Sequence, residues 1–154
     1  FSLANIKEYC GWEIFSKKIY DTYKKLSELN LIQKQFRTAL RYINMLPDIN
    51  IFEKTNLGIQ INDEKLGENQ INLTTEIPYE HGSSNLKLIN FAEAIFEKQP
   101  IKGSIVDIDT HVQHDKFKNF QEAVEFAHTA EKKLFFRLLE KEFLKTLNPI
   151  YEGK

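Results

Sequence analysis

Three stretches of the chain alternate apolar and polar side chains with a period of two residues. They are residues 32–45, which contain "FRTALRYIN", residues 70–79, "QINLTTEIPY", and residues 104–112, "SIVDIDTHV". Because successive side chains of a strand point to opposite faces, this alternation is typical of antiparallel strands with one buried and one wet face. The three stretches exclude an all-helical fold and place a half-buried sheet at the centre of the architecture.

Two further segments have the periodicity of helices. Residues 12–26 carry an apolar stripe opposite a lysine-rich face, and residues 117–147 form a longer run of the same kind. Residues 85–96 are compatible with a strand and with a helix, because "FAEAIFEK" is rich in helix formers. We therefore expect an α+β fold with an antiparallel, meandering sheet of four to six strands and two helices packed on one face. A helix-grip fold, in which the last helix closes the sheet around an apolar cavity, has the same order of elements.

The last helix contains a change of phase that one straight helix does not explain. Its two halves carry apolar stripes that differ in direction by roughly 140°, at 100° per residue. The first stripe consists of Phe120, Val124, Ala127, Leu134 and Leu138, and the second of Phe136, Leu139, Phe143 and Leu147. The pattern predicts either a break near the middle of the helix or two burial surfaces. In the second case Phe136, Phe143 and Leu147 form an interface for self-association or for a protein partner.

Composition limits the class of protein. A chain of 154 residues, 42% hydrophobic and 28% charged, is expected to form one globular domain, residues 1–154. The net charge of −1 favours neither nucleic acid nor an anionic membrane as partner, and no apolar run reaches the ~18 residues of a membrane span. The single cysteine, Cys10, favours a cytoplasmic location. Because the chain starts at Phe1, it is also compatible with the C-terminal part of a longer protein.

Four short motifs occur in a characteristic order. They are Tyr9 with Trp12 at a helix start, "RTALRYIN" at residues 37–44, the D-x-D of Asp107 and Asp109, and His128 followed by Phe135 in the last helix. In these motifs the chain resembles the later, C-terminal portion of an uncharacterised, sporadically distributed family of prokaryotic proteins with an R-x-x-L-R-Y-I-N strand. Ala39 stands where that family more often has glycine. The resemblance implies an earlier segment that opens with a strand, and it implies no activity, because none is established for the family.

Arg37 and Arg41 lie on one face of the first predicted strand, although the chain contains only three arginines. On a strand they are ~13 Å apart, too far to share one carboxylate. Three interpretations stay open: a solvated face, pairing with buried or interfacial acids, and an anion-binding site.

Asp107, Asp109 and His111 share one face of the strand at residues 104–112. Carboxylates and imidazole at alternate positions can hold a divalent metal, but the same pattern is typical of the wet side of a half-buried strand. No metal site is therefore predicted beyond these three candidates. No phosphate loop, dinucleotide fingerprint or zinc spacing occurs, so no cofactor is predicted.

Glu131 falls within the first apolar stripe of the last helix, where burial of its carboxylate requires a cation. The planar fork of arginine suits a carboxylate, so we expect Arg41, or else Arg37, to reach Glu131 across the interface between sheet and helix. His128 lies one turn before Glu131, where a carboxylate favours the protonated imidazole. The predicted binding residues are Arg37, Arg41, Tyr42, His128 and Glu131.

Three functions from different classes are compatible with these patterns. The first is a non-enzymatic protein-interaction module. The second is a binder of small apolar ligands in a helix-grip cavity, which the twelve phenylalanines favour. The third is a metal-assisted hydrolase built on Asp107, Asp109 and His111. An exposed apolar patch, a cavity and a bound ion would respectively distinguish them.

Overall fold

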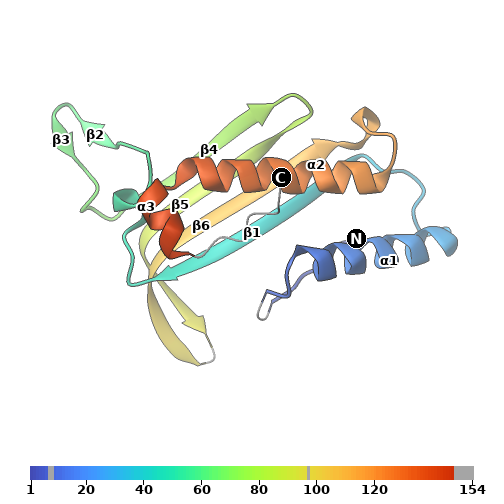
Figure 1. Cartoon of the computed structure of the whole chain (residues 1–154), viewed down its shortest axis with the longest axis horizontal. Helices are drawn as coiled ribbons and strands as arrows, with labels where there is room; N and C mark the ends of the chain where they lie inside the picture. Colours follow the sequence, from blue (N-terminus) through green and yellow to red (C-terminus); the bar gives the residue numbers. More distant parts are fainter. Residues whose placement is uncertain (7–8, 97, 148–154) are drawn as a thin grey trace. The chain divides into compact units, whose positions relative to one another are not determined.

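The computed structural model describes residues 1–6, 9–96 and 98–147 (Figure 1). The chain divides into two compact units, residues 1–36 and residues 37–154, and each is described by itself. The first unit contains α1 (Trp12–Glu28), which ends before Asn30, a residue with a left-handed φ of 54°. The helix follows the predicted apolar stripe, whose residue Ile19 is buried. The expectation of a single domain stays a prediction.

The second unit is built on a four-stranded antiparallel sheet in the order β1-β6-β5-β4. Its strands are β1 (Arg37–Pro47), β4 (Asn72–Tyr79), β5 (Gly82–Phe96) and β6 (Gln99–Gln113). The connection from β1 to β4 contains η1 (Ile51–Glu53) and a small separate hairpin of β2 (Gln60–Ile61) and β3 (Glu64–Lys65). The α+β class and the antiparallel sheet are confirmed, and residues 85–96 are strand.

The predicted last helix is broken into two. After η2 (His114–Lys116), α2 (Phe120–Leu138) packs on β6 and β1, and α3 (Lys141–Thr146) follows it. Leu139 leaves the helical conformation with a ψ of 147° and forms a bridge with Thr55. The backbone N–H of Glu140 donates to the carbonyl of Lys54 at 2.9 Å. The change of phase in the sequence therefore marks a break, and the break is held by the segment that follows η1.

The core of this unit lies between one face of the sheet and the helices α2 and α3. Its buried members are Ile51, Phe52, Leu86, Leu88, Val106, Ile108, Leu134, Leu138, Leu139, Phe143 and Leu144. Each such aliphatic or aromatic side chain stabilises the fold by about 1.5–3 kcal/mol when fully buried. On β6 the even-numbered residues from Val106 to Val112 are buried, as the alternation predicted.

This core changes the interpretation of the predicted interface residues. Phe143 is a member of the core, and Phe136 is partly buried against it. The break at Leu139 turns the second apolar stripe toward the chain's own core, so these two residues do not form the predicted exposed patch. Leu147 remains exposed. The structure therefore does not support an interface built on Phe136 and Phe143.

Candidate functional site

The sheet has a polar face on the side opposite α2. Tyr42 of β1 contacts His128 of α2 and so lies on the face that α2 covers. Arg41 precedes Tyr42, and Asp107 precedes Ile108, the residue of β6 that pairs with Tyr42. Because side chains alternate along each strand, Arg41 and Asp107 point to the opposite face. We call this side the polar face. It carries Arg37, Arg41, Asp107, Asp109 and His111, together with Glu76 of β4 and Ser83 of β5. Five residues singled out from the sequence thus share one surface.

Arg41 forms a bidentate pair with Asp107. Its Nε lies 2.9 Å from Oδ1 and its Nη2 lies 2.7 Å from Oδ2. The aspartate side chain is 11% exposed and the arginine side chain is 56% exposed, so the guanidinium covers the carboxylate. The hydrogen bond and the charge of Asp107 raise the pKa of Arg41 above its ordinary value. Of the three interpretations of the arginines, pairing with a buried acid holds for Arg41.

Arg37 is held more loosely. Its Nη2 lies 3.8 Å from Oδ2 of Asp109, and both side chains are more exposed than that of Asp107. At this separation the contact is an ion pair without a direct hydrogen bond. Arg37 therefore matches the interpretation of a solvated face, in contrast to Arg41.

The predicted pairing of Arg41 or Arg37 with Glu131 is wrong. Glu131 is buried on α2, whereas both arginines lie on the polar face and contact aspartates of β6. Burial raises the pKa of Glu131 to about 7, and Lys132 opposes this shift in part. Both arginines instead pair with aspartates of β6, which lies next to β1 in the sheet but far from it in the sequence.

Tyr42 and His128 lie on the α2 face of the sheet. The hydroxyl of Tyr42 is 3.4 Å from Nδ1 of His128, and the ring centroids are 6.1 Å apart. The predicted binding set is thus divided between two surfaces: Arg37 and Arg41 belong to the polar face, and Tyr42, His128 and Glu131 to the helix interface. These five residues do not form one site.

The three metal candidates do not converge. The carboxylates of Asp107 and Asp109 each face an arginine, and Nε2 of His111 lies 3.2 Å from the hydroxyl of Ser83. Within residues 1–6, 9–96 and 98–147, no three side chains of histidine, cysteine, aspartate or glutamate gather as metal ligands do. The alternation along β6 is therefore explained by the polar side of a half-buried strand.

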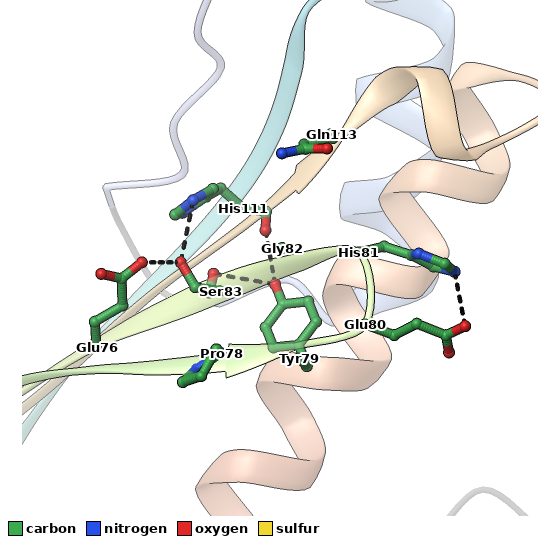
Figure 2. Close-up of a pocket in the computed structure, with 9 residues that line it drawn as sticks. All are labelled: Glu76, Pro78, Tyr79, Glu80, His81, Gly82, Ser83, His111 and Gln113. Carbon is green, nitrogen blue, oxygen red and sulfur yellow. Dashed lines mark hydrogen bonds and ion pairs between the residues drawn. The ribbon is translucent and has the colours of Figure 1, made fainter.

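A shallow pocket lies where the β4–β5 hairpin meets the end of β6 (Figure 2). It has a volume of about 360 Å³, and its lining includes Glu76, Tyr79, Ser83 and His111. The hydroxyl of Ser83 donates to Oε1 of Glu76 and is also in contact with Nε2 of His111. These contacts join three strands. The sequence offered no signal for Ser83 or Glu76, because their neighbours become known only from the strand register.

Tyr79 and Gly82 fix the β4–β5 hairpin to β6 at this pocket. The Tyr79 hydroxyl donates to the carbonyls of His111 at 2.8 Å and Ser83 at 3.1 Å, and burial raises the pKa of Tyr79 to about 12. A Cβ at Gly82 would lie 2.0 Å from the carbonyl oxygen of His111, so only glycine fits there. The hairpin is thus locked onto β6.

The chemistry of the pocket differs from that of a nucleophilic triad. In such a triad the imidazole accepts the proton of the serine and a carboxylate orients the imidazole. Here the carboxylate of Glu76 accepts from Ser83, and the buried Nδ1 of His111 has no hydrogen-bond partner among the described residues. The pocket is suited to hydrogen bonding rather than to activation of the hydroxyl.

A second feature is an arm formed by β5 and β6 beyond the four-stranded part of the sheet (Figure 1). We define the β5–β6 arm as residues 91–96 of β5 and residues 99–102 of β6. The pairing of β1 ends where Pro47 meets Gly103, and β4 begins where Asn72 meets Ile89. At its base the carbonyl of Lys102 accepts from the N–H of Asp48 at 3.0 Å; beyond this bond the described part of the arm is a two-stranded ribbon.

The arm exposes apolar side chains. Phe91 is 50% exposed and Ile95 is 82% exposed. Phe91 also has a φ of 50°, in the left-handed region that an aromatic residue rarely adopts. Such a conformation costs roughly 1–3 kcal/mol and persists only where the surrounding structure imposes it.

Asn90 anchors the backbone immediately before Phe91. Its buried side chain accepts from the N–H of Ile71 at 2.6 Å and donates to the carbonyl of Asn69 at 2.7 Å. The strand register shifts between Ile89 and Ala92, so a bulge separates the arm from the rest of β5. Bulges redirect side chains and recur near functional surfaces. Here the bulge holds Phe91 in an exposed position.

The comparisons with known proteins found no family model, no curated protein and no solved structure that matches this chain. The resemblance to the family with the R-x-x-L-R-Y-I-N strand accordingly stays a prediction. Among the residues that the structure describes, no helix has the length and apolar character needed to span a membrane.

Proposed function

We propose that this chain is a non-enzymatic protein-interaction module that presents the β5–β6 arm to a protein partner. The observation that carries the proposal is Phe91, an exposed aromatic residue in a strained backbone conformation. The buried hydrogen bonds of Asn90 anchor the bulge at this position, but they do not explain the exposed aromatic ring. It is explained if the side chain contacts a partner, because strain concentrates at functional positions.

The chemistry of the arm supports a protein partner. Phe91 and Ile95 offer apolar contact area, and the ion pair of Glu93 with Lys102, at 2.7 Å, supplies a charged rim next to them. An apolar centre with a polar rim is the usual composition of protein interfaces. The proposal places the module in the cytoplasm, since Cys10 is the only cysteine in the chain.

The other two functions make different demands. A binder of small apolar ligands needs a cavity with apolar walls, whereas the hairpin pocket includes Glu76, Glu80, His81 and His111 in its lining. A metal-assisted hydrolase needs Asp107 and Asp109 to exchange their arginines for an ion. Millimolar Mn²⁺ that raised the melting temperature, with the effect lost in Asp107→Asn/Asp109→Asn, would favour this alternative.

Capture of a partner from a lysate of the source cells, followed by binding of the purified partner, tests the proposal. Phe91→Asn removes the aromatic ring at a position whose φ asparagine tolerates, and Ile95→Thr keeps a β-branched residue. Each should weaken binding about tenfold or more, as loss of an interface anchor does. Ile61→Thr is the control, because Ile61 is an exposed isoleucine of β2. Equal binding by all variants would refute the role of the arm.

A further inference from the structure

β4 is the last strand of the sheet and leaves one edge open (Figure 1). The sheet order ends at β4, so no strand in the described part of the chain pairs with its outer edge. An open edge presents unpaired N–H and C=O groups that can pair with another chain. Which groups these are follows from the register with β5.

The register places the even-numbered residues of β4 outward. Tyr79 and Gly82 flank the two-residue loop of the hairpin and so exchange backbone hydrogen bonds. The same phase holds at the other end, where Asn90 N–H donates to the carbonyl of Ile71. The odd-numbered residues therefore bond to β5, and the backbone groups of Asn72, Thr74, Glu76 and Pro78 face outward. Proline is tolerated there because it has no N–H to lose from the ladder.

The edge is protected at one end only. Charges and proline are the usual devices that prevent edge pairing, and β4 has them at Glu76 and Pro78. Residues 71–75 carry no charge and include isoleucine, leucine and two threonines, which suit a strand. Asn72, Thr74 and Thr75 are exposed. This stretch is thus available to a second strand.

A second copy of β4 fits this edge in one antiparallel register. With the two-fold axis at Thr74, the facing pairs are Thr74 with Thr74, Asn72 with Glu76, Leu73 with Thr75 and Ile71 with Ile77. The amide of Asn72 can donate to the carboxylate of Glu76, threonine faces threonine, and isoleucine faces isoleucine; such cross-strand pairs are favourable. No like charges oppose each other.

The neighbouring registers are worse. An axis at Thr75 sets Asn72 against Pro78, which lacks the required N–H. An axis at Glu76 sets two carboxylates face to face, which is destabilising. An axis at Leu73 leaves only residues 72–74 of β4 paired within the strand. The sequence of β4 thus selects one register with itself.

We propose that β4 pairs with β4 of a second copy of this chain about a two-fold axis at Thr74. The Thr74 pair and the two Asn72–Glu76 pairs then exchange about six backbone hydrogen bonds. The two sheets become one continuous sheet, and the interface is isologous, as in most symmetric dimers. This inference does not rest on the proposed role of the β5–β6 arm, which lies on a different part of the sheet.

Disulfide trapping tests the register directly. In a Cys10→Ser background, Thr74→Cys places two thiols in a pair whose Cα atoms are about 5.5 Å apart, within the range for a disulfide. Asn72→Cys is the matched control, because the two copies of residue 72 are then roughly 14 Å apart. Mild oxidation should give at least about tenfold more crosslinked dimer for Thr74→Cys than for Asn72→Cys. Equal yields would overturn the proposed register.

Sedimentation equilibrium tests the dimer itself. At roughly 100 µM the full chain, of 18.1 kDa, should sediment with twice its mass. Thr74→Pro removes an N–H that faces outward and leaves the bonds to β5 intact, so it should yield a folded monomer. If this variant fails to fold, Thr74→Lys, which sets two like charges opposite each other, takes its place. A monomeric wild type, or a folded variant that remains dimeric, contradicts the proposal. Phe91→Asn should leave the dimer unchanged, which separates this surface from the arm.

Discussion

Arg41 and Asp107 are joined by two hydrogen bonds of 2.9 Å and 2.7 Å between neighbouring strands. Charge-assisted bidentate pairs of this kind are stronger than single contacts, and they order both side chains. The aspartate is largely shielded from water by the arginine that binds it. Removal of the arginine therefore leaves a poorly solvated carboxylate.

Arg41→Met should lower the free energy of unfolding by about 1–2 kcal/mol, between the values for exposed and for buried ion pairs. The double variant Arg41→Met/Asp107→Leu should recover most of this loss, because no charge is then left without a partner. Arg37→Met is the control and should cost less than about 0.5 kcal/mol, since its contact with Asp109 is longer and more exposed. Urea unfolding of the wild type, Arg41→Met, Asp107→Leu, the double variant and Arg37→Met measures these differences. Additive effects of the two substitutions would show that the pair is not coupled.

Glu131 should make stability depend on pH. Its pKa in the folded state is raised to about 7, so the native state holds a proton that the unfolded state has already released. Stability should therefore fall as the pH rises from about 4.5 to 7, by about 2–3 kcal/mol in all, and then level off. Glu131→Gln should remove this dependence and should be more stable than the wild type at pH 8. Glu64→Gln, at an exposed position of β3, should leave the dependence unchanged.

Phe91 provides a test of backbone strain. Phe91→Asn and Phe91→Ala both remove the ring, but only asparagine readily adopts the left-handed conformation. We expect Phe91→Asn to be more stable than Phe91→Ala by about 1 kcal/mol, and as stable as the wild type or more so. Thermal unfolding measures both. Equal stability of the two variants would show that residue 91 stores no strain.

Two glycines should tolerate no side chain. A Cβ at Gly82 or Gly103 would lie 2.0 Å or 2.1 Å from a carbonyl oxygen of the adjacent strand. Gly82→Ala and Gly103→Ala should each destabilise the chain by roughly 2–4 kcal/mol, because a strand must move to admit the methyl group. Gly58→Ala and Gly67→Ala are the controls, since a Cβ at either position meets no atom within 4 Å. Calorimetric melting temperatures of the four variants decide the matter.

The alternation of side chains was sufficient to predict which residues of β1, β4 and β6 share a face. On β1 it did not tell which face meets the helix, because the predicted pairing with Glu131 set Arg41 on the wrong side. It predicted that Val106, Ile108 and Val112 are buried and that Arg37 and Arg41 share a face, and both hold in the structure. It also located an irregularity in the last helix. These features depend on residues close together in the sequence, where periodicity carries the information.

The partners of the charged residues could not be predicted in the same way. The pairing of Arg41 with Asp107 depends on β1 lying beside β6, and no local pattern encodes that order. The pocket residues Ser83 and Glu76 meet His111 only because three strands align in one register. The left-handed conformation of Phe91 was also missed, because aromatic residues rarely adopt it and because the bulge depends on the distant contacts of Asn90.

The order of the strands also has a kinetic consequence. β4, β5 and β6 follow one another in the chain, whereas β1 must pair with β6 across the whole meander. Closing this long loop costs chain entropy before any contact of β1 is gained, so local pairing precedes it. We predict that the hairpins of β4, β5 and β6 form the folding nucleus and that the bond between Arg41 and Asp107 forms after it. Loss of the bond between Arg41 and Asp107 should therefore accelerate unfolding and leave the folding rate almost unchanged. Different strands would then control how fast the sheet assembles and how long it lasts once formed.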